Sequence, residues 1–230
     1  MSRQSNIKKT TFILMIINLL SRFLGFIREM IIAKVFGRNS VTDAFFAAFT
    51  IPDVMYDLLV VGALSSGFMP VFNEHLAKDD EEGAWKAANT FITVALIFIV
   101  IFNILYYAFA KYLIPLVAIG NAKDPATYTL TVKLTRFMTV SVSFAVCAGL
   151  SMGVLNSYKI FTAPALGPVM YNVGIILGAI VLGGKFGIFG LAAGVIFGAF
   201  LNFGIQIPNF VKVGKRFRLE LNTKMKAIRE

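Results

Sequence analysis

The sequence predicts an all-α, polytopic membrane protein, a bundle of six transmembrane helices with both termini in the cytoplasm. Hydrophobic residues make up 57% of the 230 residues and charged residues only 15%, whereas a soluble domain is about 45–50% apolar and about 25% charged. Apolar runs recur that reach the roughly 20 residues a helix needs to cross the hydrocarbon. These runs are continuous, unlike the alternating segments of about 10 residues that are typical of a β-barrel.

Six apolar runs meet the length requirement, and we interpret them as the spans of one domain, residues 1–211. They cover residues 10–36, 41–72, 85–115, 125–155, 159–183 and 186–211. The first four exceed the minimum length, which predicts tilted helices or ends that project beyond the bilayer. The first run is followed by no small-residue cleavage site, so we expect a retained span and not a signal peptide.

The orientation follows from the distribution of lysine and arginine. The side that holds the N-terminus carries 13 of these residues, the opposite side carries 5, and four more fall within the spans. The positive-inside rule therefore predicts that both termini are cytoplasmic. Residues 212–230 form a basic tail, for which the sequence leaves open a short helix on the anionic leaflet or a disordered segment.

Composition also excludes several classes of function. The net charge of +10 does not indicate a nucleic-acid partner, because the basic residues lie between and after the apolar runs. Cys147 and His75 are the only cysteine and histidine, so we expect neither a disulfide nor a metal centre within the chain. No phosphate-cradling glycine loop and no paired nucleophile and base appear. We therefore predict a transporter without a cofactor, and not an enzyme.

Two arginines inside the first span are the main functional signal. Arg22 and Arg28 would each cost about 2.5–3.5 kcal/mol in the hydrocarbon unless they face a polar cavity or a partner. Arg22 and Glu29 lie two turns apart, about 10 Å, and are no obvious pair. The guanidinium groups would then be available to an anion such as phosphate, and Gly25 allows close approach or bending. Alternatively, both arginines pair with aspartates of the second span and lock the fold.

The second span is predicted to be a kinked helix with a polar side. Thr42 is expected to cap its start, with Asp43 beside the positive helix end. Asp43 could also act as a gate or as an arginine partner. Pro52 should kink the helix and Pro70 should end it. The small-residue patch at residues 62–67, which includes Gly62 and Ser65, offers close approach to a helix or a headgroup; together with Gly25 and Pro52, these two residues form the predicted gate and hinge.

Later spans carry weaker signals. Lys133 and Arg136 are explained by side chains that extend to the interface, although a role in receiving an anionic cargo stays open for Arg136. Small residues spaced by four allow close packing of helices. Such spacings occur at 149/153 and 174/178, and Gly190, Gly194 and Gly198 are the best candidates for contact with a second lobe.

Several stretches resemble the MurJ (MviN) family of lipid II flippases, members of the multidrug/oligosaccharidyl-lipid/polysaccharide exporter superfamily. They are residues 21–29 (SRFLGFIRE), 36–37 (FG), 42–49 (TDAFFAAF), 51–52 (IP), 62–72 (GALSSGFMPVF), 155–156 (LN) and 161–168 (FTAPALGP), followed by Asn172. The resemblance implies one six-helix lobe of a fourteen-helix protein, whose two lobes enclose a cationic cavity that opens alternately to either side. This chain looks like the N-terminal lobe alone.

The resemblance also implies roles for individual residues. Arg22, Arg28 and Asp43 match positions that are functional in the family's cavity and gate, and Arg136 falls where a basic residue is usual. Tyr56 stands where many members have an arginine, so the cavity is less basic than the family pattern.

The implied partners are lipid II, the lipids of the bacterial cytoplasmic membrane, and a second lobe supplied by a missing C-terminal half, by a separate chain or by a copy of this chain. Two alternatives stay open: an exporter of another polyprenyl-linked saccharide or of a small molecule, and a half-length membrane interaction protein that transports nothing.

Overall fold

The computed structural model describes residues 3–56, 64, 67–121, 123–214 and 216–220, and within them all regular secondary structure is helical. This confirms the all-α class. The helices are α1 (Arg3–Phe36), α2 (Ser40–Tyr56), α3 (Met69–Ala77), α4 (Glu81–Val117), α5 (Pro125–Ser157), α6 (Thr162–Leu177), α7 (Gly183–Phe186), α8 (Ile188–Gly204) and α9 (Ile207–Val213), with a π-helical segment, Gly178–Leu182, between α6 and α7.

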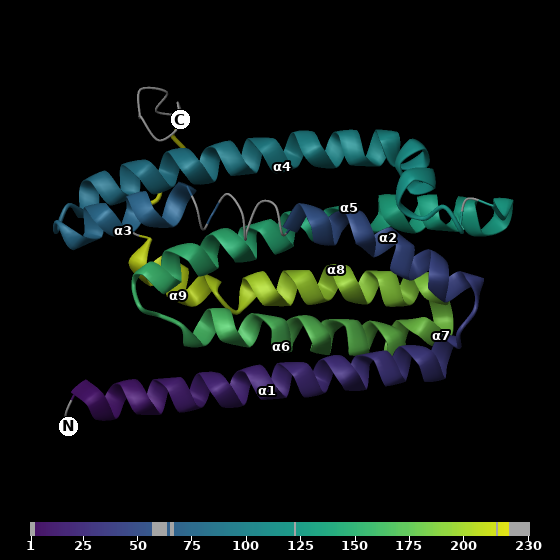
Figure 1. Cartoon of the computed structure of the whole chain (residues 1–230), viewed down its shortest axis with the longest axis horizontal. Coiled ribbons are helices and arrows are strands. Elements are labelled where there is room, and N and C mark those ends of the chain that lie inside the picture. The colour runs from purple at the N-terminus through teal and green to yellow at the C-terminus, as the bar shows by residue number, and fades with distance from the viewer. Residues whose placement is uncertain (1–2, 57–63, 65–66, 122, 215, 221–230) are drawn as a thin grey trace.

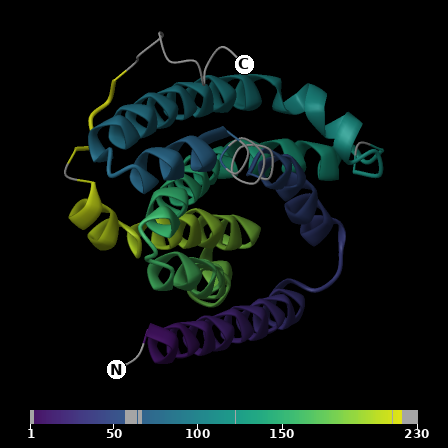
Figure 2. The ribbon, with the colours of Figure 1, turned by 60° about the vertical axis from the view of Figure 1, so that its left-hand side comes forward.

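The long helices lie side by side along the length of the molecule (Figure 1). α1 forms one edge and packs on α6, α6 packs on α8, α8 on α5, and α5 on α4, which forms the opposite edge. α2 returns from the end of α1 to pack on α5, so α1 and α2 diverge from their connection (Figure 2). The start of α1 and α9 lie at the same end of the bundle (Figure 1).

Five helical segments among the described residues are long and apolar enough to cross a membrane. Each coincides with one predicted span, and together they are Lys8–Phe36, Glu81–Leu116, Pro125–Ser157, Thr162–Phe186 and Ile188–Val213. The second predicted span, 41–72, falls partly on residues outside the description. Its described parts are α2, which contains Pro52 and ends at Tyr56, and α3.

Pro70 does not end the second predicted span, contrary to the prediction. It lies in the first turn of α3, which continues to Ala77. A proline is tolerated there because the first N–H groups of a helix have no partner within the helix.

Asn39, and not Thr42, caps α2. The Asn39 Oδ1 atom accepts hydrogen bonds from the backbone N–H groups of Val41 (2.9 Å) and Thr42 (3.2 Å). The Thr42 hydroxyl accepts one in return from the Asn39 N–H at 3.0 Å. With Asn39 as the cap, the helix begins at Ser40, and Asp43 is exposed in its first turn, where a negative charge is favourable.

Glycines bring α6 and α8 into backbone contact, and this corrects the role predicted for three of them. A Cβ atom added at Gly174 would lie 2.3 Å from the Gly198 Cα atom, and one at Gly178 would lie 2.3 Å from the Gly194 Cα atom. A Cβ atom added at Gly190 would lie 2.4 Å from the backbone carbonyl of Leu182. Gly190, Gly194 and Gly198 are therefore buried inside this chain and present no surface to a second lobe.

The start of the tail is neither a surface helix nor a separate segment. α9 ends at Val213, and residues 216–220, which are not helical, lie against the first turns of α4. Residues 221–230 lie outside the described part of the chain.

Candidate functional site: a cavity between three helices

A cavity of about 280 Å³ lies where α1, α2 and α6 approach one another. Its polar wall comes from α1, its aromatic wall from α2, and its third wall from α6. The lining residues are Arg28, Glu29, Ile32, Phe45, Phe46, Phe49, Thr50, Tyr171 and Ile175. A cationic group beside aromatic rings suits a ligand that combines negative charge with apolar or sugar surface.

Arg28 is the basic residue in the lining of this cavity. Its Nε and Nη2 atoms donate to Glu29 Oε1 at 3.1 and 2.6 Å, and its Nη1 atom donates to Asn172 Oδ1 at 3.0 Å. Described residues thus use three of the five guanidinium N–H groups and leave one on each Nη atom. Arg28 pairs with its own neighbour Glu29, a contact that the spacing of Arg22 and Glu29 did not indicate, and its availability to an anion stays a prediction.

Asn172 of α6 holds Arg28 in place. Its Nδ2 atom donates to the backbone carbonyls of Ser21, at 3.2 Å, and Pro168, at 3.0 Å. Because both amide hydrogens have acceptors, the Oδ1 atom must face Arg28. Asn172 is only 6% exposed, so this bridge between α1 and α6 is shielded. From the sequence, Asn172 stands out only through the family resemblance, because no spacing rule connects residues 144 positions apart.

Arg22 and Asp43 are near the cavity's helices but not in its wall. Both side chains are exposed, and neither makes an ion pair or side-chain hydrogen bond with a described residue. The alternative in which the arginines pair with aspartates of the second span is thus not supported for Asp43, and the other two aspartates, at 53 and 57, lie outside the described side chains. Gly25 lies against Asn172, and a Cβ atom there would sit 3.9 Å from Asn172 Nδ2, an ordinary contact.

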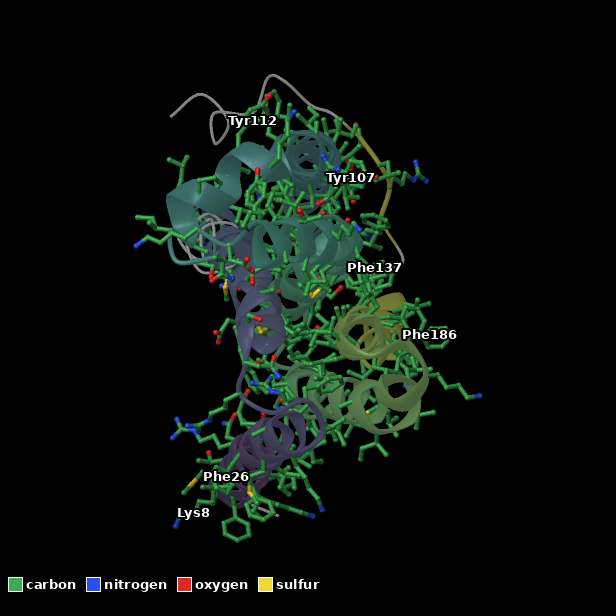
Figure 3. The ribbon with its side chains drawn as sticks, turned by 90° about the vertical axis from the view of Figure 1, so that its right-hand side faces the viewer. Lys8, Phe26, Tyr107, Tyr112, Phe137 and Phe186 are labelled. Atoms are coloured by element: carbon green, nitrogen blue, oxygen red, sulfur yellow. The ribbon has the colours of Figure 1, made fainter. Side chains whose placement is uncertain are left out.

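Arg136 belongs to a different part of the molecule. Its Nε atom donates to the backbone carbonyl of Tyr107 on α4 at 3.0 Å, and its guanidinium lies 5.2 Å from the centre of the Tyr107 ring. Figure 3 shows Tyr107 at the edge opposite Phe26 of α1. Arg136 therefore does not line the cavity that contains Arg28. Its contacts with Tyr107 join α5 to α4.

The remaining predicted residues cannot be placed as side chains. Gly62 and Ser65 lie outside the described residues, as do the side chains of Pro52 and Tyr56. Within the described residues no group of three or more histidine, cysteine, aspartate or glutamate side chains is arranged to hold a metal ion.

A family model described as lipid II flippase MurJ matches residues 32–230. This chain belongs to the lipid II flippase MurJ family. The family resemblance seen in the residues is thereby confirmed. Arg28 precedes the matched residues by four positions, whereas Asn172 lies within them.

Curated members of the MurJ family match most of this chain but less than half of their own length. The lipid II flippase MurJ of Burkholderia cenocepacia is 34% identical over 197 residues, which cover 85% of this chain and 38% of the relative. The probable lipid II flippase MurJ of Borreliella burgdorferi is 31% identical over 205 residues, covering 89% of this chain and 40% of the relative. The chain thus spans about two fifths of the length of these MurJ relatives.

The MurJ fold is also recognised in three dimensions. A solved structure of lipid II flippase MurJ in an inward closed conformation superposes with a TM-score of 0.77 at 28% identity. The match covers 93% of this chain and 44% of that structure. The family is one of transporters, in agreement with the helical membrane architecture.

Proposed function

We propose that this chain is the N-terminal lobe of a lipid II flippase in the bacterial cytoplasmic membrane, and that the cavity between α1, α2 and α6 receives the lipid headgroup. The observation that carries the proposal is the placement of Arg28. Asn172 holds its guanidinium at a cavity whose other walls are largely aromatic. Family membership supports lipid II as the cargo. Lipid II is a diphosphate that carries sugars and a peptide on a long polyprenyl chain.

The first step is recognition of the diphosphate by Arg28. A guanidinium is planar and binds phosphate oxygens through two parallel N–H groups, which a lysine cannot do. Among the described residues, Arg28 has partners for all but one N–H group on each Nη atom. A phosphate that enters the cavity can therefore be bound without loss of the Asn172 contact.

Glu29 acts as a counterion that the cargo displaces. Its side chain is 47% exposed, and that of Arg28 is 27% exposed. Ion pairs at this degree of exposure are worth about 0.2–1 kcal/mol. A diphosphate with two negative charges can therefore replace Glu29 at small cost, and Glu29 keeps Arg28 neutralised when the cavity is empty.

The aromatic wall provides the remaining contacts. Phe45 packs edge-on against Phe46 and Phe49, with ring centroids 5.5 and 5.1 Å apart. Such rings exclude water and so strengthen the charge interaction at Arg28. The polyprenyl chain would stay in the bilayer beside α1, whose outer face includes Phe26, 63% exposed.

Movement of α1 would open and close the cavity. A glycine in a helix interior costs about 0.8–1 kcal/mol relative to alanine, and the space at Gly25 does not require a glycine for packing. We therefore assign Gly25 as the hinge, next to the Asn172 bridge, with Pro52, Gly62 and Ser65 as its counterparts along the second span. Arg22 and Asp43 then lie at the rim as gate residues.

A complete transport cycle needs a second lobe, supplied by a C-terminal continuation, by a separate chain or by a copy of this chain. α1 and α2 diverge from their connection (Figure 2). We place the second lobe on the side of the cavity that lies between these two helices. Alternating access then consists of rocking of the two lobes about the bound headgroup.

Neutralising Glu29 tests this arrangement. Glu29→Gln is expected to raise the affinity for lipid II roughly twofold to fivefold, because it removes the counterion that competes with the diphosphate. The measurement is lipid II binding by the whole chain in nanodiscs. Glu74→Gln is the matched control. It removes the same charge from the exposed ion pair that Glu74 of α3 forms with Lys78 (2.6 Å), and it should leave the affinity for lipid II unchanged. Weaker binding by Glu29→Gln would contradict the counterion role.

A further inference from the structure

A second cavity of about 280 Å³ lies away from the first, between α4, α5, α8 and α9. Its lining is apolar except for one hydroxyl and one thiol, and consists of Ile92, Leu96, Cys147, Leu150, Ser151, Phe203, Ile207, Phe210 and Phe217. Apolar cavities of about 150 Å³ stay dry and take up small hydrocarbons. This cavity is larger and therefore suits a hydrocarbon chain and not a polar ligand.

Residues 216–220, which we call the strap, form one side of the cavity. The Asn89 side chain donates to the Arg216 carbonyl at 3.2 Å and accepts from the Arg218 N–H at 3.0 Å. One turn along α4, the Thr93 hydroxyl accepts from the Glu220 N–H at 3.1 Å. Both α4 side chains are buried. The backbone of every second strap residue is thus fixed, and Phe217 between them lines the cavity and packs against Phe210, with ring centroids 5.8 Å apart.

The cavity opens beside α9. Ile207 lines it and is still 38% exposed, and Val211, one turn further, is 63% exposed. Both lie in Ile188–Val213, a segment apolar enough to span the membrane. The mouth therefore faces the hydrocarbon of the bilayer, near the end of the bundle that holds the start of α4.

Basic side chains lie next to the residues that form this cavity. Lys212 lies in the last turn of α9, two residues after Phe210, and Arg218 follows Phe217 on the strap, where it also lines a neighbouring polar pocket with Glu82 and Glu220. Neither Lys212 nor Arg218 forms an ion pair with a carboxylate of the described residues. Arg216 has one carboxylate oxygen, from Glu81, at 3.9 Å. Unpaired cations beside an apolar opening match the chemistry of an anionic phospholipid, with its phosphate at the surface and its chains in the interior.

We propose that this cavity holds one acyl chain of an anionic phospholipid from the leaflet that borders the start of α4, with the headgroup near Lys212 and Arg218. In a bilayer the chain gains no hydrophobic energy by entering protein. The gain comes from dispersion contacts that fill the void and from the charge attraction. The site is independent of the Arg28 cavity, and its test can fail without affecting the proposed transport function.

The test uses the whole chain in nanodiscs of phosphatidylcholine with a minor fraction of phosphatidylglycerol that carries a photoactivatable diazirine on one acyl chain. Peptide mapping after illumination is expected to find adducts at 147–151 and 203–210. Ser151→Phe fills the cavity and should abolish these adducts, while adducts on the outward face of α4, around Ile104, stay as an internal reference.

Surface variants keep the test informative if the filled cavity disturbs folding. The double variant Lys212→Ala, Arg218→Ala should reduce adducts from the phosphatidylglycerol probe roughly tenfold or more, to the level of a phosphatidylcholine probe. Lys111→Ala, Lys133→Ala, on α4 and α5, is the charge-matched control and should not reduce them. Adducts confined to the outward face of α4, equal labelling by both probes in the unaltered chain, or stronger labelling by a polyprenyl phosphate probe would each overturn the proposal.

Discussion

Alanine at Gly174 or Gly194 is expected to destabilise the protein by about 1–3 kcal/mol or more, the range found for overpacked interiors. The added Cβ atom would lie 2.3 Å from the Gly198 Cα atom in the first variant and 2.7 Å from the Gly178 Cα atom in the second. Backbone atoms of a neighbouring helix cannot move aside as a side chain can. α6 and α8 must therefore separate, which disrupts the support on which α1 and Asn172 rest.

The measurement is the midpoint of thermal unfolding of the purified chain in mild detergent. Gly204→Ala is the matched control, because nothing lies within 4 Å of its Cβ position at the end of α8. It should leave the midpoint unchanged or raise it slightly, since alanine favours helix over glycine. Equal midpoints for Gly174→Ala, Gly194→Ala and Gly204→Ala would show that the backbone contact of α6 and α8 does not carry stability.

Removal of the guanidinium at Arg28 is expected to have the largest effect on function. Arg28→Ala should weaken lipid II binding roughly tenfold to 150-fold, because hydrogen bonds to a charged group contribute about 1.5–3 kcal/mol. Arg28→Lys should recover only part of this loss, since lysine cannot bind phosphate through two parallel N–H groups. Lys34→Ala, also on α1 but outside the cavity lining, is the control and should bind as the unaltered chain does.

Asn172 gives a second way to disturb the same guanidinium. Asn172→Leu keeps the branched shape of the side chain but removes the acceptor for Arg28 and the donor to the Ser21 carbonyl. Affinity should then fall by a smaller factor than in Arg28→Ala, while the net charge stays the same. Full affinity in Asn172→Leu would show that Arg28 does not depend on the bridge to α6.

The sequence predicted the fold class and indicated Arg28 as a candidate residue, because both inferences depend on local chemistry. Continuous apolar runs define spans wherever they occur, and an arginine in such a run needs a polar environment wherever its partner lies. Arg28 was identified in this way. Glycines at 174 and 178 were likewise recognised as packing positions from their spacing alone.

Most of the predictions that the structure contradicts concern contacts between distant parts of the chain. Spacing cannot tell which helix a glycine stripe faces, so Gly194 was assigned to a second lobe instead of to Gly178. The Asn172 bridge joins helices separated by most of the chain. The cap of α2 was misassigned for a local reason: Asn39 and Thr42 both favour a helix start, and only the reciprocal hydrogen bonds identify which residue begins it.

The most direct test of the central claim is native mass spectrometry of the purified chain in mild detergent, with lipid II and with undecaprenyl diphosphate that lacks the saccharide. We expect the unaltered chain to retain lipid II, whether as a monomer or as a dimer that completes the cavity. We expect the Arg28→Ala variant to retain no lipid II. An unaltered chain that retains no lipid II at saturating concentration, or that retains it equally after Arg28→Ala, would contradict the assignment of this cavity to the headgroup.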